Sequence, residues 1–174
     1  MAILVCPLSR VQEQVRTHRP SRVVSLLDPG THWPDVGQDG IDAHLKIGVH
    51  DIAEPQTGCT DPQAHHMHEI LDFLRPWDQA APLLIHCYAG ISRSTATAFI
   101  AACLHNPDVD EAVLARALRS ASPSASPNRR IVALADAALG RQGRMSQAIL
   151  SIGKGAHWSE IGEAQPFAIA ARHG

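Results

Sequence analysis

The amino-acid sequence predicts an α/β fold in which a central, mostly parallel sheet of about four to five strands is flanked by helices. Short apolar runs rich in β-branched residues come early in the chain, and segments with helical spacing lie between and after them. Loops rich in Pro, Gly and Asp separate these segments. Such alternation of strands and helices favours a parallel or mixed sheet covered on both faces.

The predicted strands are four short runs. They are Ala2–Val5, Arg22–Leu27, His44–Val49 and Pro82–Cys87. Helical spacing appears in five segments, which are 9–17, 61–78, 92–105, 110–119 and 128–139. Two loops, 28–40 and 51–62, are longer than simple turns, so we expect them to be functional.

The length of the chain favours one domain. It has 174 residues, 45% of them hydrophobic, which is enough to bury a single core. We therefore expect one domain over residues 1–174. Residues 152–174 mix Gly, Pro and His without clear periodicity, so an irregular C-terminal tail is expected there.

Charge and cysteine usage limit the possible partners. The formal net charge is -2, so no overall positive field would attract nucleic acid or anionic lipid. No run reaches the roughly 18 apolar residues of a membrane-spanning helix, and the first residues lack a signal-peptide pattern. The four cysteines, Cys6, Cys59, Cys87 and Cys103, form no C-x-x-C pair. We expect a cytoplasmic protein with neither nucleic-acid nor membrane partners.

One motif stands where a predicted strand meets a predicted helix. Residues 86–95 read HCYAGISRST, which fits the pattern H-C-x5-R-S/T. In open α/β sheets the carboxyl ends of the strands face the ligand crevice. The loop's backbone N–H groups and the positive end of the helix dipole would form a concave site for a tetrahedral anion. The residues expected to bind phosphate in this way are Tyr88, Ala89, Gly90, Ile91, Ser92 and Arg93.

The side chains of the motif suit nucleophilic chemistry. The helix N-terminus and a nearby guanidinium favour the thiolate of Cys87, which is the nucleophilic form. Arg93 offers a planar fork of donors for two phosphate oxygens. Ser94 can donate its hydroxyl to the sulfur, Gly90 lets the loop turn, and His86 is expected to order the loop by hydrogen bonding. A lone buried Cys beside a core His would be structural, but the complete motif favours catalysis.

These residues give the chain a resemblance to the protein-tyrosine-phosphatase superfamily, and in particular to its small bacterial dual-specificity-like branch. The resemblance runs from about His44 to Leu134. It implies the cysteine-phosphatase fold and a phosphocysteine intermediate that water hydrolyses. We expect neither a cofactor nor a metal.

The resemblance further implies a general acid on a loop before the nucleophile. Asp51 is the best match, because it directly follows a predicted strand and lies 36 residues before Cys87. Glu54 and Asp61 lie on the same loop and stay open as alternatives. Asn128, in a Ser-Pro-Asn segment, resembles the residue that supports the phosphate loop in dual-specificity enzymes, although a helix cap would also explain it.

The expected activity is therefore hydrolysis of phosphomonoesters, with a phosphorylated protein or peptide as substrate and inorganic phosphate as product. Phosphotyrosine is the first choice, and phosphoserine or phosphothreonine remains open. The lining residues Tyr88, Ala89, Ile91 and Ser92 carry no charge, which disfavours highly anionic inositol phosphates.

Two other functions compete with this one. A rhodanese-like sulfurtransferase also places a thiolate in a loop that ends in Arg, but its loop is typically one residue shorter. A phosphate-binding pseudophosphatase would keep the nest and lack turnover.

The cluster of Cys59, His65, His66 and His68 contains zinc-ligand residue types. Its spacing matches no common zinc module, so we expect no metal there. A second hypothesis makes Cys59 a redox partner of Cys87.

Overall fold

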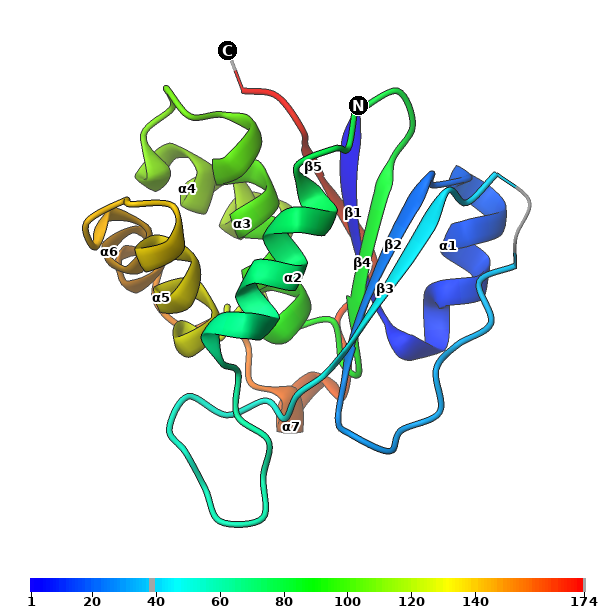
Figure 1. Cartoon of the computed structure of the whole chain (residues 1–174), viewed down its shortest axis with the longest axis horizontal. Coiled ribbons are helices and arrows are strands. Elements are labelled where there is room, and N and C mark those ends of the chain that lie inside the picture. The colour runs from blue at the N-terminus through cyan, green and yellow to red at the C-terminus, as the bar shows by residue number, and fades with distance from the viewer. Residues whose placement is uncertain (38–39, 174) are drawn as a thin grey trace.

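The computed structural model describes residues 1–37 and 40–173 and contains a five-stranded sheet between two layers of helices (Figure 1). The strands are β1 (Ala2–Pro7), β2 (Arg22–Leu27), β3 (Ala43–Gly48), β4 (Leu83–Cys87) and β5 (Phe167–Ala170). Their order across the sheet is β3-β2-β4-β1-β5. β1 to β4 pair in parallel, and β5 is antiparallel to β1. The predicted mostly parallel sheet is confirmed.

The fifth strand comes from the segment expected to be an irregular tail. β5 pairs with β1 in a register that places Ile169 opposite Ile3. Ile169 is buried, while its neighbours Ala168 and Ala170 are exposed. Residues 152–173 therefore contain an edge strand of the sheet, whose short length and alanines concealed it in the sequence.

The helices cover both faces of the sheet. They are η1 (Leu8–Arg10), α1 (Val11–His18), α2 (Ala64–Leu74), α3 (Arg93–His105), α4 (Glu111–Ala121), α5 (Arg129–Ala138), α6 (Arg144–Ser151) and α7 (Trp158–Ile161). Figure 1 shows α1 on one face and α2 to α6 on the other. The helix predicted for residues 61–78 is too long at both ends. Gln63 caps α2 in a capping box with His66, and Pro76 has no N–H to continue the helix.

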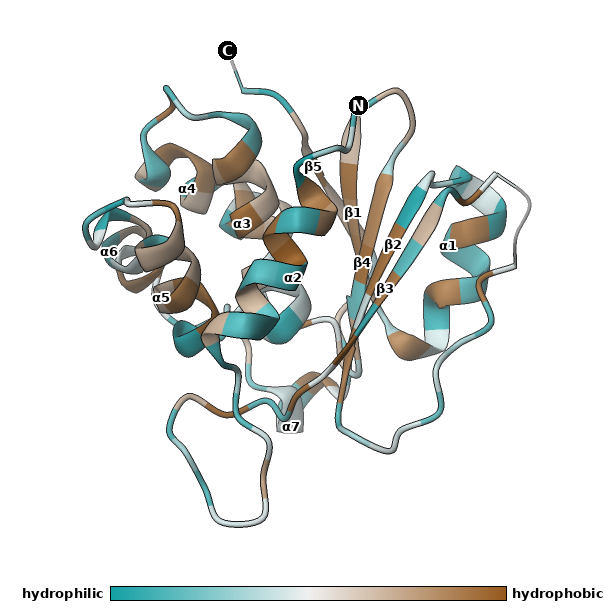
Figure 2. Ribbon diagram, viewed as in Figure 1, coloured by the Kyte–Doolittle hydropathy of each residue, from teal (hydrophilic) through white to brown (hydrophobic). Residues whose placement is uncertain are grey.

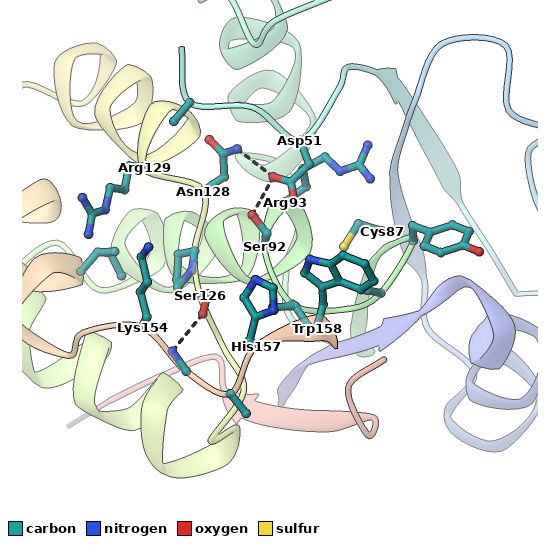
Figure 3. A pocket seen from close by; sticks show the side chains of 18 of the residues that line it. Asp51, Cys87, Ser92, Arg93, Ser126, Asn128, Arg129, Lys154, His157 and Trp158 are labelled. Carbon is teal, nitrogen blue, oxygen red and sulfur yellow. Dashed lines mark hydrogen bonds between the residues drawn. The ribbon is translucent and has the colours of Figure 1, made fainter. Parts of the chain in front are cut away.

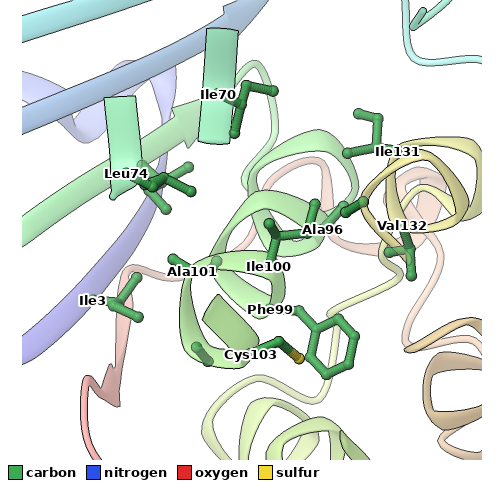
Figure 4. Close-up of a cluster of buried hydrophobic side chains, with 14 of the residues drawn as sticks. Ile3, Ile70, Leu74, Ala96, Phe99, Ile100, Ala101, Cys103, Ile131 and Val132 are labelled. Atoms are coloured by element: carbon green, nitrogen blue, oxygen red, sulfur yellow. The ribbon is translucent and has the colours of Figure 1, made fainter. Parts of the chain in front are cut away.

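Helix α3 lies at the centre of the larger core. Phe99, Ile100 and Ala96 are fully buried and lie between Ile131 of α5 and Ile70 of α2 (Figure 4). Hydrophobic residues also run along β1 and β4, which enter this core from the sheet (Figure 2). Because α3 is packed on every side, its first residue, Arg93, is held rigidly at the sheet edge.

The carboxyl ends of the four parallel strands meet at one edge of the sheet. The chain leaves β1 at Pro7, β2 at Leu27, β3 at Gly48 and β4 at Cys87. This edge is where open α/β sheets bind ligands. Within residues 1–37 and 40–173, no helix combines the length and apolarity that crossing a bilayer requires.

Candidate active site

The loop between β4 and α3 turns its backbone carbonyls outward. The carbonyl of Tyr88 accepts from Leu8 N at 3.0 Å, and that of Ala89 accepts from Ala164 N at 2.8 Å. Those of Ile91 and Ser92 accept from Ser126 N at 2.8 Å and Asn128 N at 3.2 Å. Since C=O and the following N–H point in opposite directions across a trans peptide, the amides of the next residues face the inside of the loop.

These inward amides line a hollow. In the part of the chain that the structure describes, the N–H groups of residues 89–92 donate to no protein atom. Successive free amides at the start of a helix form the kind of nest that holds a phosphate. The loop residues named from the sequence therefore surround these amides, and their role in binding phosphate stays a prediction.

Gly90 is required by both conformation and space. Its φ of 72° lies in the left-handed region. A Cβ at this position would lie 2.9 Å from Pro7 N and 3.0 Å from the Cys6 carbonyl carbon. The loop therefore rests directly on the end of β1.

Cys87 ends β4 with only 3% of its surface exposed. Its Sγ lies 3.0 Å from Ser94 Oγ, in the first turn of α3. When the sulfur is a thiolate, the hydroxyl is the donor in this contact.

Arg93 uses one of its guanidinium nitrogens to bind the protein, and another has no partner among the described residues. Its Nη1 donates to Asp28 Oδ1 at 2.7 Å and to Val49 O at 2.8 Å. Its buried Nε has no partner among the described residues. The unpartnered Nε lies on the guanidinium edge that binds two oxygens side by side in arginine–phosphate pairs. Asp28, which follows β2, is a positioning residue that the motif could not reveal.

Asp51 is held beside the hollow by two donors. Ser92 Oγ lies 2.7 Å from Asp51 Oδ1, and Asn128 Nδ2 lies 2.9 Å from the same oxygen (Figure 3). Both donors meet Oδ1, which leaves Oδ2 as the oxygen that would carry a proton. Asn128 also caps α5, because its Oδ1 accepts from Ile131 N. One side chain therefore both caps a helix and holds Asp51.

The two alternative acids lie elsewhere. Asp61 forms an ion pair with Arg130 at 2.6 Å and accepts from Gln63. Glu54 is exposed and is not among the described residues that line the pocket with Cys87. Geometry therefore favours Asp51, which does line it.

His86 belongs to a buried hydrogen-bonded chain across three strands. Its Nε2 contacts Ser25 Oγ, and the same hydroxyl lies 2.7 Å from His44 Nε2. A hydroxyl has one proton, so it donates to one imidazole and accepts from the other. Burial lowers the pKa of both His86 and His44 to about 4, which keeps both rings neutral.

The pocket extends well beyond the motif. Its volume is about 790 Å³, within the range of small-molecule sites. Lining residues that the sequence did not indicate come from the start of α5, from α6 itself and from the segment after α6. They are Arg129, Ile149, Gly153, Lys154, Gly155, Ala156, His157, Trp158 and Gly162. Only the fold brings these residues to the site, because they lie 42 to 75 positions from Cys87.

The residues of zinc-ligand type, Cys59, His65, His66 and His68, do not line this pocket. His66 accepts from Gln63 N in the capping box of α2, and its ring lies 3.8 Å from that of His65. Among the described residues, no three potential ligands are grouped as a metal site. Cys59 is a free thiol and does not line the described pocket, so its redox role stays a prediction.

Several solved structures share this fold. Human DUSP28 is 19% identical, over 79% of this chain and 93% of that chain, with a TM-score of 0.58. The Yvh1 phosphatase domain from Chaetomium thermophilum is 21% identical, over 81% and 92%, with a TM-score of 0.54. The human tyrosine phosphatase-like serine/threonine/tyrosine-interacting protein is 15% identical, over 79% and 91%, with a TM-score of 0.59.

The chain therefore has the dual-specificity phosphatase fold, which confirms the predicted fold class. No protein-family model matches the sequence, and no curated protein matches it. At these identities the likeness concerns the fold, and the names include both phosphatases and a phosphatase-like protein. Membership of a bacterial branch stays a prediction, and activity must be argued from the site.

Gly90→Ala is expected to damage the hollow, because the new Cβ meets the β1 backbone and the residue must keep a positive φ. We expect phosphate affinity to fall at least about tenfold and stability to fall by about 1–3 kcal/mol. Calorimetric phosphate titration and urea unfolding measure these changes. Gly140→Ala is the matched control, since its φ is 64° with nothing within 4 Å of the added Cβ. Equal effects of the two substitutions would contradict the argument.

The neutral state of His86 predicts a pH dependence of stability. Its folded pKa of about 4 lies below the ordinary 6.5, so the unfolded chain binds the proton first. The free energy of unfolding should fall between pH 6.5 and pH 4, by about 3 kcal/mol for this group. Urea unfolding at several pH values measures it. His86→Asn should flatten the curve over that range, and an unchanged slope would exclude His86 as the cause.

Proposed function

We propose that the protein is a cysteine-dependent phosphatase that hydrolyses phosphomonoesters through a phosphocysteine intermediate. The observation that carries this proposal is the hollow itself. Inward amides, the Cys87 sulfur and the free edge of Arg93 converge there, with Asp51 fixed at its side. Phosphorylated protein is the proposed substrate, and inorganic phosphate is the product.

The first step forms the intermediate. The thiolate of Cys87 attacks phosphorus while the amides and Arg93 hold the equatorial oxygens. The bond to the leaving oxygen breaks, and protonated Asp51 supplies its proton from Oδ2. The two hydrogen bonds at Oδ1 support this role, because they fix the carboxyl while leaving the other oxygen free.

The second step restores the enzyme. The Asp51 carboxylate takes a proton from a water molecule that attacks the phosphocysteine, and the S–P bond breaks. The sulfur leaves as a thiolate, which the Ser94 hydroxyl 3.0 Å away stabilises. Neither step draws on a cofactor or a metal.

Phosphotyrosine is the favoured phosphoresidue. The pocket wall next to Cys87 carries the exposed indole of Trp158, and Ile91 and Pro127 also line it (Figure 3). An aromatic ring buries more apolar surface against such a wall than the short side chain of phosphoserine does.

Cys87→Ser should abolish turnover of p-nitrophenyl phosphate, by about 10⁴-fold or more, because the nucleophile is lost. Binding of phosphate or vanadate should persist, since the amides and Arg93 are unchanged. Steady-state assays and calorimetry test both parts, with Cys59→Ser as the control that keeps turnover. Activity retained in Cys87→Ser would refute the mechanism, and thiosulfate-to-cyanide transfer by the wild type would favour a sulfurtransferase.

Asp51→Asn should lower kcat about 10²-fold for aryl phosphates with poor leaving groups and less for good ones. The amide oxygen can still accept from Ser92 and Asn128, so the geometry is kept and only the proton is lost. The basic limb of the pH profile should also disappear. Assays over a series of leaving groups and pH values measure this, with Glu54→Gln as the control. The same losses in Glu54→Gln would move the acid role to Glu54.

A further inference from the structure

Two cationic side chains line the pocket away from the Cys87 hollow. Arg129 begins α5, and Lys154 lies in the segment between α6 and α7 (Figure 3). They line the same pocket as Cys87 and Arg93. A substrate whose phosphoryl group sits at Cys87 could therefore reach them with another part of the same molecule.

Neither cation is paired with an acidic side chain among residues 1–37 and 40–173. In the described chain, Arg129 and Lys154 make no ion pair and no side-chain hydrogen bond. The neighbouring Arg130 differs, because it pairs with Asp61 and donates to Pro62 O. Asp51 is the one carboxylate among the described lining residues, and its Oδ1 already accepts two hydrogen bonds. The part of the wall that Arg129 and Lys154 form thus has positive charge that is paired with no carboxylate among the described residues.

The backbone around Lys154 is anchored. Arg119 donates to Gly153 O at 2.8 Å, and Gly155 N donates to Ser126 Oγ at 2.9 Å. A Cβ on Gly155 would lie 2.5 Å from the Ser124 carbonyl carbon, so this segment packs against the chain before α5 without room for a side chain. The backbone at Lys154 is therefore fixed. Less conformational entropy of this segment would be lost when an anion binds.

We propose that Arg129 and Lys154 form a second anion-binding position that selects acidic phosphopeptides. The substrate would place its phosphoresidue at Cys87 and a neighbouring carboxylate between these two cations. This inference rests on the proposed phosphatase function for its substrate and adds a preference that the uncharged loop residues could not provide. The cations contribute through charge complementarity, which raises affinity and association rate.

The test compares two phosphotyrosine peptides that differ only at the residues flanking the phosphotyrosine. One carries Asp and Glu there, and the other carries Asn and Gln. The Cys87→Ser protein should bind the acidic peptide about tenfold more tightly at low ionic strength, as expected for two partly exposed ion pairs. Adding Arg129→Gln and Lys154→Gln should reduce this ratio to near one. Higher salt should reduce it as well.

Arg116→Gln is the matched control, because Arg116 is an exposed arginine of α4 that does not line the described pocket. It removes one positive charge, as Arg129→Gln and Lys154→Gln each do, and should leave the ratio unchanged. A ratio near one in the Cys87→Ser protein, or a ratio that survives the double substitution, would overturn the inference. Because binding is measured without turnover, failure of the wild type to hydrolyse p-nitrophenyl phosphate would count against the proposed function alone.

Discussion

The site depends on the outward direction of four carbonyl groups in one short loop. The backbone N–H groups that bind these carbonyls come from three segments: Leu8 at the start of η1, Ser126 and Asn128 before α5, and Ala164 before β5. Each hydrogen bond turns one peptide so that its N–H faces inward. The loop alone could not hold this shape, because amide groups that point toward one another without acceptors are unfavourable. The hydrogen bonds from other segments to the loop carbonyls stabilise it.

The side chains around the loop are also oriented by hydrogen bonds to other parts of the fold. Arg93 gives Nη1 to Asp28 and Val49, and this fixes the guanidinium plane while Nε stays unused. Asn128 caps α5 with its oxygen and holds Asp51 with its nitrogen. Arg93 is thus oriented through Nη1 while its Nε has no partner among the described residues, and Asn128 orients Asp51 with the atom that it does not use as a cap. Such preorganisation is what makes electrostatic stabilisation effective in an active site.

The sequence revealed what is encoded locally. The four parallel strands are short apolar runs, and the H-C-x5-R-S/T motif is contiguous, so both could be predicted without knowledge of the fold. Asp51 could be proposed because it follows a strand that ends at the same sheet edge. Asp28, Arg129 and Lys154 have no local signature, since an isolated charged residue in a loop looks the same whether it faces a pocket or water. β5 was missed because four residues with two alanines give little strand signal.

The segment after α6 links the sheet to the site. β5 fixes its far end against β1, and Ala164 N holds the Ala89 carbonyl of the loop. Between these anchors and α6 it carries Lys154 and Trp158, which line the pocket. The contacts that order the phosphate hollow and those that shape the outer pocket therefore lie on one stretch of chain. Under the proposed function, substitutions in this segment would therefore change substrate preference without altering Cys87, Arg93 or Asp51, because the loop is held through backbone atoms and the pocket is lined by side chains.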